Sequence, residues 1–276
     1  MDIAHLQTWI GREARVRDVA ARGPLDGLAA LLDHEAPPWA GGMVPPLGHW
    51  LYFLPRACQS ELGEDGHPRR GGFLPPVPLP RRMWAGGDLS FHRPVPVGAA
   101  LERVSTVEEV TAKTGASGEM VFVTVRHAVY ADGAVAIEER QEIVYRDAPG
   151  ETAPAPAGEA RSAEVSREYL AGPVALFRFS ALTFNSHRIH YDRDYARGEE
   201  GYPGLVVQGP FIATLLMDLY LRERPGTAVR SFSFRARAPL FDFAPFTLNL
   251  ADDGNGTGLW AADADGRAAM TARVEG

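Results

Sequence analysis

One arrangement occurs twice along this chain of 276 residues: a helix with large apolar side chains at helical spacing, and several strand-like runs. In "GPFIATLLMDLYLRE" the apolar spacing is helical, and Pro210 suits the first turn because its missing N–H had no partner to lose. "PLDGLAALLDHE" keeps the same spacing after Pro24. This order predicts two units, each a sheet with one helix.

The strand-like runs alternate in the manner of a half-covered sheet. Four runs between residues 86 and 146 are rich in β-branched and aromatic side chains and are separated by glycine turns. In "MVFVTVRHAVY" the valines at 121, 123 and 125 alternate with other side chains, which is typical of an antiparallel sheet with one covered face. Similar runs follow residue 228.

The two halves also share sequence. With a constant offset of 143 residues, Ser90-Phe91 falls on Ser233-Phe234 and Pro96-Val97 falls on Pro239-Leu240. The match favours an internal duplication of one unit. We therefore expect a first unit over residues 1–147 and a second over residues 164–276.

Proline and glycine mark two irregular segments. Residues 36–82 contain "APPWAGGMVPPLG" and "GGFLPPVPLPRR", which predict a long loop in the first unit. Residues 148–163, "APGETAPAPAGEARSA", have the composition of a linker and separate the two predicted units.

Composition excludes several classes of protein. A net charge of −7 argues against a surface that recruits nucleic acid, and no apolar run of about 18 residues could span a membrane. The single cysteine, Cys58, excludes an internal disulfide framework, and the first residues lack a secretory signal. We expect a cytoplasmic protein.

The stretch "FNSHRIHYD", residues 184–192, gathers polar side chains before the second predicted helix. It fits a metal site, an acid/base site or a polar loop. His187 and His190 are three residues apart, whereas the usual catalytic zinc helix spaces its histidines by four around a glutamate, and no further ligand cluster stands out in the sequence. We therefore expect no metal here.

The segment that follows adds a second catalytic element. In "GYPGLVVQGP", Gly209 begins the second-half helix, where free amides and the helix dipole favour negative charge. A histidine that moves a proton and an amide that holds a developing enolate oxygen are the two parts needed for chemistry next to a carbonyl.

These motifs, with the upstream "RMWAGG" and "VYR", resemble the MaoC-like or hydratase-2 family of the hot-dog fold. They are most similar to its double hot-dog subgroup, which includes mesaconyl-C4-CoA (3-methylfumaryl-CoA) hydratase, itaconyl-CoA hydratase and the type 2 3-hydroxyacyl-thioester dehydratase. The resemblance implies an α+β fold in which two curved antiparallel sheets, each wrapped around a helix, pack as a pseudo-dimer.

The same resemblance implies an activity. It is the reversible hydration of a short carboxylated enoyl-CoA of the mesaconyl-C4 or itaconyl type, with no cofactor beyond the CoA thioester substrate and with a possible homodimer. Two alternatives stay open. The chain could be a general 3-hydroxyacyl-thioester dehydratase, or a non-catalytic hot-dog protein that binds acyl thioesters.

The resemblance also implies roles for the motif residues. Asn185 stands where the larger family has a carboxylate, and an amide cannot take a proton. His190 is then expected to carry the proton transfer, with Asn185 orienting water or substrate and Gly209 N–H stabilising the enolate. His187 is either a second proton carrier or a structural partner.

A substrate with a free carboxylate requires a cation, and arginine is the preferred one. Arg188, beside His190, is our first choice for the carboxylate, while Arg81 and Arg82 could equally hold CoA phosphates, and Trp84 is expected at the rim of the acyl pocket. The full set expected to contact substrate is Arg188, Arg178, Arg81, Arg82, Trp84, Gln208 and Tyr191.

Overall fold

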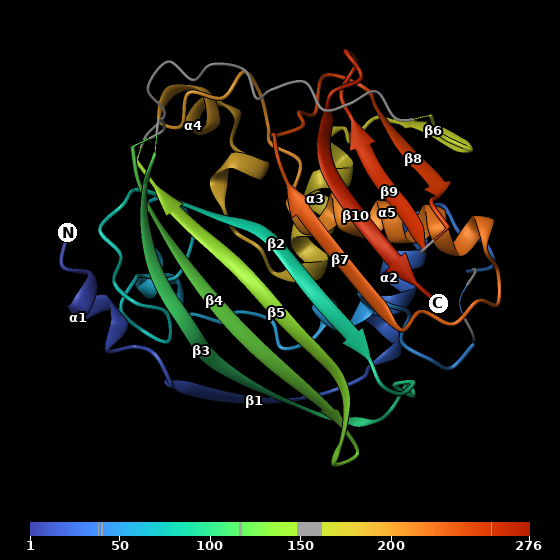
Figure 1. Ribbon diagram of the computed structural model, residues 1–276, viewed down its shortest axis with the longest axis horizontal. Helices are drawn as coiled ribbons and strands as arrows, with labels where there is room; N and C mark the ends of the chain where they lie inside the picture. Colours follow the sequence, from blue (N-terminus) through green and yellow to red (C-terminus); the bar gives the residue numbers. More distant parts are fainter. Residues whose placement is uncertain (38, 40, 116–117, 148–161, 255) are drawn as a thin grey trace.

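A computed structural model describes residues 1–37, 39, 41–115, 118–147, 162–254 and 256–276 (Figure 1). The strands are β1 (Glu13–Val19), β2 (Arg81–Phe91), β3 (Ala100–Gly115), β4 (Gly118–Ala131), β5 (Ala134–Arg146), β6 (Val165–Tyr169), β7 (Ser231–Ala236), β8 (Phe246–Asp252), β9 (Thr257–Ala262) and β10 (Ala268–Glu275). The α-helices are α1 (Ile3–Gln7), α2 (Arg22–Leu31), α3 (Pro173–Thr183), α4 (Arg193–Gly198) and α5 (Gly209–Glu223). Short 3₁₀ turns are η1 (Gly48–Leu51), η2 (Gln59–Glu61) and η3 (Arg188–His190).

The strands form one antiparallel sheet in the order β1-β3-β4-β5-β2-β7-β10-β9-β8-β6. The alternating valines at 121, 123 and 125 lie in β4, between β3 and β5, and all three are buried. The three valines therefore lie on a covered face as predicted, although Thr124 between two of them is buried as well. A side chain at every second position packs into the covered face because successive residues of a strand point to opposite faces.

The two halves of the sheet meet where β2 pairs with β7. In this antiparallel pair Leu89 lies opposite Phe232, which is also its equivalent under the offset of 143 residues. A residue paired with its own equivalent lies on the axis of a pseudo-two-fold relation. The double hot-dog fold with pseudo-dimer packing is therefore confirmed.

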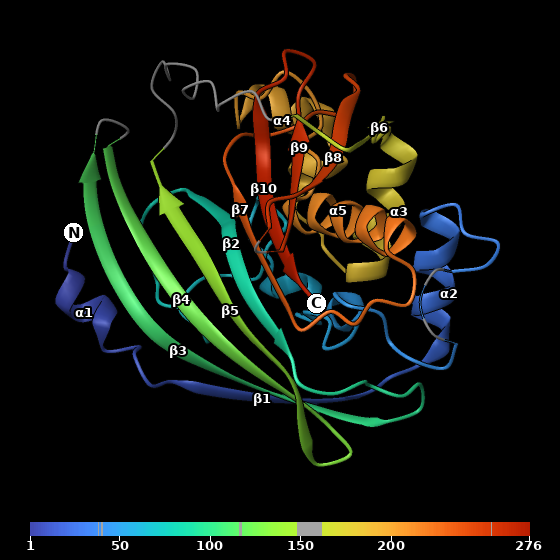
Figure 2. The same ribbon diagram turned by 45° about the vertical axis from the view of Figure 1, so that its right-hand side comes forward.

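The second half wraps its sheet around α5. This helix packs on β8, β9 and β10 (Figure 2). Every residue from Phe211 to Leu221 is buried. Its apolar spacing was predicted, and its burial on all sides explains why few polar residues interrupt it.

The first half differs in detail from that plan. Helix α2 packs mainly on α3 and η1 (Figure 2). A Cβ at Gly27 would lie 2.7 Å from the Leu182 side chain, so α2 and α3 are in close contact. Much of the first-half sheet is covered instead by α1 and by apolar residues of the long loop, including Val77 and Leu79. This arrangement leaves room for a cavity between the loop and the sheet.

Two expectations concern the rest of the chain. The predicted linker, residues 148–163, lies outside the described residues except for its last two. None of the helices in the described ranges has both the length and the apolar run needed to span a bilayer.

Candidate active site

His190 is held as a neutral base. It lies in η3 and is 6% exposed, and its Nδ1 is 2.7 Å from the carbonyl oxygen of Val206. A carbonyl can only accept, so Nδ1 carries the proton and Nε2 keeps its lone pair. Burial lowers the pKa of His190 to about 4, although the bond to Val206 works to raise it. At neutral pH the imidazole is therefore uncharged and able to accept a proton.

His190 lines a cavity of about 900 Å³ that both halves of the chain enclose. Asn185 and Gly209 of the second half line it, and so do His67, Arg82 and Trp84 of the first half. The structure thus brings together the four residues predicted to be catalytic, which are Asn185, His187 and His190 from "FNSHRIHYD" and Gly209 at the start of α5.

Gly209 presents a free amide to this cavity. It is the first residue of α5, and within the described residues its N–H has no hydrogen-bond acceptor. The next residue, Pro210, has no N–H, and the amide of Phe211 bonds to the Gln208 carbonyl at 3.0 Å. Among the first three helical positions, Gly209 therefore offers the one free donor, at the positive end of the helix dipole.

Asn185 is fixed by its own loop. Helix α3 ends at Thr183, Phe184 takes a left-handed conformation with φ 50°, and the Asn185 amide bonds to the Ser180 carbonyl at 2.9 Å. The Asn185 Oδ1 accepts the N–H of His187 at 3.1 Å. Nδ2 donates to no described residue, so both of its N–H groups are available to the cavity.

His187 contacts two other histidines. Its ring centroid lies 4.1 Å from that of His67 and 5.4 Å from that of His190. Burial, followed by the nearby imidazoles, lowers the pKa of His187 to about 2. A ring that stays neutral at every working pH is unsuited to carry the proton of the reaction by itself.

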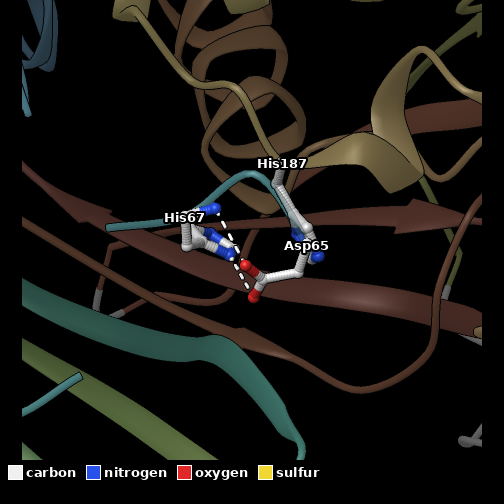
Figure 3. A group of neighbouring side chains, drawn as sticks. All are labelled: Asp65, His67 and His187. Carbon is white, nitrogen blue, oxygen red and sulfur yellow. Dashed lines mark hydrogen bonds and ion pairs between the residues drawn. The ribbon is translucent and has the colours of Figure 1, made fainter. Parts of the chain in front are cut away.

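His67 and Asp65 come from the long first-half loop. The Asp65 carboxylate accepts from His67 twice, from the backbone N–H at 2.9 Å and from Nδ1 at 3.1 Å (Figure 3). Burial works to raise the pKa of Asp65, but the hydrogen bonds from His67 outweigh it and hold that pKa well below its usual value. Asp65 is therefore a carboxylate at neutral pH.

The ligand atoms of Asp65, His67 and His187 lie within 4.8 Å of one another, a spacing that a metal ion could bridge. However, Nδ1 of His67 is already bonded to Asp65. The positive charge of Arg82 also acts on both histidines. Because a nearby guanidinium repels a cation, we assign no metal to this cluster.

Three residues expected to contact substrate lie outside the cavity. Arg188 donates from two nitrogens to one oxygen of Asp192, Oδ2, at 2.7 and 3.0 Å, and Tyr191 donates to the Ser186 carbonyl at 3.0 Å. Arg178 is exposed on α3. Our first choice of Arg188 for the substrate carboxylate is therefore wrong, because its charge is already neutralised and it does not line the cavity.

The remaining four expected residues do line it. Arg81 pairs with Glu200 at 3.0 Å, whereas Arg82 makes no ion pair with any described residue. Gln208 donates to the Leu176 carbonyl and to Ser180, both at 3.0 Å, which ties α5 to α3. Trp84 packs against Trp50 and Phe234. Arg82 is thus the one of the four expected arginines that reaches the cavity without a carboxylate partner among described residues.

Sequence reasoning missed Asp65 and His67 because they lie in a segment interpreted only as a loop. The signal was "EDGHP", in which an acidic residue, a glycine and a histidine interrupt the proline-rich run. That pattern is short and common. Nothing in the linear sequence placed it beside residues 184–190.

Comparison with known proteins adds the family context. A model of the family described as hydroxyacyl-thioester dehydratase type 2 matches residues 47–242. The mesaconyl-C(4)-CoA hydratase of Chloroflexus aurantiacus is 47% identical, and the alignment covers 100% of this chain and 99% of that protein. The mitochondrial hydroxyacyl-thioester dehydratase type 2 of Schizosaccharomyces pombe is 26% identical, with coverages of 89% and 91%.

Two solved structures share the fold. HtdX of Mycobacterium tuberculosis superposes with a TM-score of 0.68 at 19% identity, covering 96% of this chain and 100% of that one. A MaoC-like dehydratase from Phytophthora capsici gives a TM-score of 0.71 at 13% identity, covering 100% and 99%. These likenesses establish the architecture.

Proposed function

The chain belongs to the hydroxyacyl-thioester dehydratase type 2 family, and on that premise we propose that it catalyses the reversible hydration of a short enoyl-CoA that carries a free carboxylate. The observation that carries the proposal is the pairing, in one cavity, of the Nε2 lone pair of His190 with the free N–H of Gly209. A proton acceptor and an oxyanion donor are the two groups that addition of water next to a thioester requires.

In the proposed reaction, Gly209 N–H bonds the thioester oxygen. His190 Nε2 takes a proton from water as the water oxygen bonds to the β carbon, and the electron pair of the double bond moves to the thioester as an enolate. The amide group of Asn185 donates to the water or the substrate. This chemistry uses side chains, a backbone amide and water, so it calls on no resident cofactor.

The substrate carboxylate is assigned to Arg82. In a mesaconyl-C4 thioester the free carboxylate is attached to the β carbon, so its cation must lie beside the proton-transfer groups. Arg82 fits this requirement, because it lines the same cavity as His190 and its charge acts on His187, whose ring contacts that of His190. No described carboxylate forms an ion pair with Arg82. A bidentate arginine–carboxylate pair would also fix the β carbon relative to the attacking water.

Arg82→Gln tests this assignment. We expect kcat/KM for mesaconyl-C4-CoA to fall about 10- to 100-fold, the loss expected for one charged hydrogen-bonded pair, while kcat/KM for the uncharged crotonyl-CoA stays within about threefold. Arg188→Gln is the matched control because that guanidinium is outside the cavity. An equal loss on both substrates would show that Arg82 does not recognise the carboxylate.

Gly209→Ala tests the oxyanion site. A Cβ at this position meets protein atoms only at ordinary distances, 3.9 Å to the Trp84 carbonyl and 4.0 Å to Met270. The helix should therefore form normally, whereas the methyl group crowds the thioester oxygen, and we expect kcat to fall about 10²-fold with an unchanged melting temperature. Gly172→Ala, at the start of α3 with open space around it, is the control and should retain full activity.

The function itself is tested by hydration assays of mesaconyl-C4-CoA, itaconyl-CoA and crotonyl-CoA with the purified chain. Turnover of a carboxylated thioester at a higher kcat/KM than crotonyl-CoA would support the proposal. Faster turnover of crotonyl-CoA would favour the second candidate, a general 3-hydroxyacyl-thioester dehydratase. The observation that supports this second candidate is the apolar part of the cavity wall, where Phe122, Val125 and Ile143 could accommodate a longer acyl chain.

A further inference from the structure

Hydration of an enoyl thioester moves a proton at two atoms, the attacking water and the α carbon. The motif in residues 184–192 contains one base that the geometry prepares, His190, and Asn185 stands where a carboxylate would assist it. His187 stays neutral and its ring has no hydrogen-bond partner within the described residues. Within this motif only His190 could also serve the α carbon, so a separate proton donor has to come from elsewhere in the cavity wall.

The first-half loop provides such a group. Nδ1 of His67 donates to the Asp65 carboxylate at 3.1 Å, so the proton of the neutral ring is on Nδ1 and the lone pair is on Nε2. Within the described residues Nε2 has no hydrogen-bond partner, and His67 lines the same cavity as His190. A carboxylate behind an imidazole fixes its orientation and stabilises its protonated form.

The loop is held against the motif by contacts of its backbone. Ser186 Oγ donates to the Gly66 carbonyl at 2.5 Å, and the Arg188 amide donates to the Asp65 carbonyl at 2.9 Å. Gly66 has φ +85°, and a Cβ there would overlap the Ser186 carbonyl oxygen. The close approach therefore requires glycine between the two residues of the pair.

Resting on the hydratase function proposed above, we propose that Asp65 and His67 form the second acid/base pair of the reaction. The reaction starts with His67 protonated on both ring nitrogens and His190 neutral. As water gives its proton to His190 and its oxygen bonds to the β carbon, the enolate forms; the α carbon then takes the proton from Nε2 of His67, which becomes neutral. His190 gains one proton and His67 loses one. Transfer between them, with the His187 ring in contact with both, restores the starting state. His67 is the catalytic residue, and Asp65 is the positioning residue.

The charges around His67 make Asp65 indispensable to this role. Burial lowers the pKa of His67, and Arg82 and Arg70 lower it further, while the hydrogen bond and charge of Asp65 raise it. His187, whose ring contacts that of His67, is neutral. On balance the pKa of His67 is lowered, and Asp65 is the group that limits this lowering and so keeps the protonated form of His67 accessible between two arginines.

The test measures hydration kinetics of Asp65→Asn and His67→Ala against the wild-type chain. We expect each variant to lose about 10²-fold in kcat with KM within about threefold, since the groups act on the proton and not on binding. Added imidazole should restore part of the activity of His67→Ala and none to Asp65→Asn. Glu138→Gln is the matched control, because Glu138 bonds an exposed histidine, His92, at 2.9 Å outside the cavity.

A pH profile separates this role from a structural one. Hydration needs protonated His67, so kcat is lost as the pH rises through the pKa of His67. Removing the carboxylate lowers that pKa, and the loss in Asp65→Asn should therefore move to lower pH by about one unit. A merely structural carboxylate would lower kcat without moving the profile.

The possible failures are distinguishable. If the wild-type chain hydrates a thioester and both variants keep the wild-type kcat, the role of the pair is overturned and the hydratase function stands. Loss of kcat without imidazole rescue and without a shifted profile would also overturn it, in favour of a role in loop structure. A wild-type chain that hydrates none of the three thioesters would overturn both proposals.

Discussion

His190→Asn is expected to lower kcat for hydration about 10³-fold with little change in fold. The asparagine amide can donate to the Val206 carbonyl in place of Nδ1, so the buried acceptor stays satisfied. It has no lone pair at the position of Nε2, however, and the loss of a positioned base typically costs 10²- to 10⁴-fold in rate. Steady-state kinetics, with circular dichroism as the check on folding, measures the effect.

Two further variants define how specific that loss is. His92→Asn removes an exposed histidine outside the cavity and should leave kcat unchanged. His190→Ala should lose as much kcat as His190→Asn and, in addition, some stability, because it leaves the Val206 carbonyl buried without a donor. If His190→Asn retained kcat within threefold of the wild type, water would have to be activated by another group.

Gly66→Ala is expected to be the most damaging substitution outside the motif. The added Cβ overlaps the Ser186 carbonyl, and this atom belongs to backbone that is held by the bond from Tyr191 as well. The loop must therefore move away from residues 186–188, which carries Asp65 and His67 out of the cavity. We expect a kcat loss of at least about 10²-fold, as for removal of the acid/base pair itself.

Gly42→Ala is the control that separates loss of the loop contact with residues 186–188 from the backbone strain of placing alanine at a positive φ. Gly42 has φ +79°, close to the value at Gly66, but nothing lies within 4 Å of its added Cβ. Both variants therefore incur a similar conformational cost of about 1 kcal/mol, whereas only Gly66→Ala breaks the contact between the halves. Limited proteolysis of residues 63–70 should be faster in Gly66→Ala alone. Equal proteolysis and equal kcat in the two variants would contradict this account.

The catalytic elements of the second half could be predicted because they are local in sequence. His190 and Asn185 lie five residues apart, and the free amide of Gly209 follows from where a strongly periodic helix begins. The same local reasoning failed for Arg188. Residues 188 and 190 share one 3₁₀ turn, and side chains two positions apart in such a turn point to different sides. Nearness in sequence therefore did not bring the guanidinium into the cavity.

The contribution of the first half could not be predicted for a different reason. Asp65 and His67 are about 120 residues from the motif, in a loop with no hydrophobic periodicity. What brings them there is a backbone contact at Gly66, and such a contact leaves no pattern in one sequence. Helix α2 shows the same limit, since its apolar spacing predicted a helix but not that its main partner would be α3.

The pairing of β2 with β7 has a consequence for how the molecule can vary. In a dimer of identical chains related by a two-fold axis, every side chain occurs twice, so a substitution that improves one end of the interface is repeated at the other. Here the two strands that pair at Leu89 and Phe232 are encoded by separate parts of one chain. The second half can therefore keep the histidine motif while the first half has a substrate cavity and a docked loop where a central helix would pack on its sheet. Neither feature is repeated in the other half.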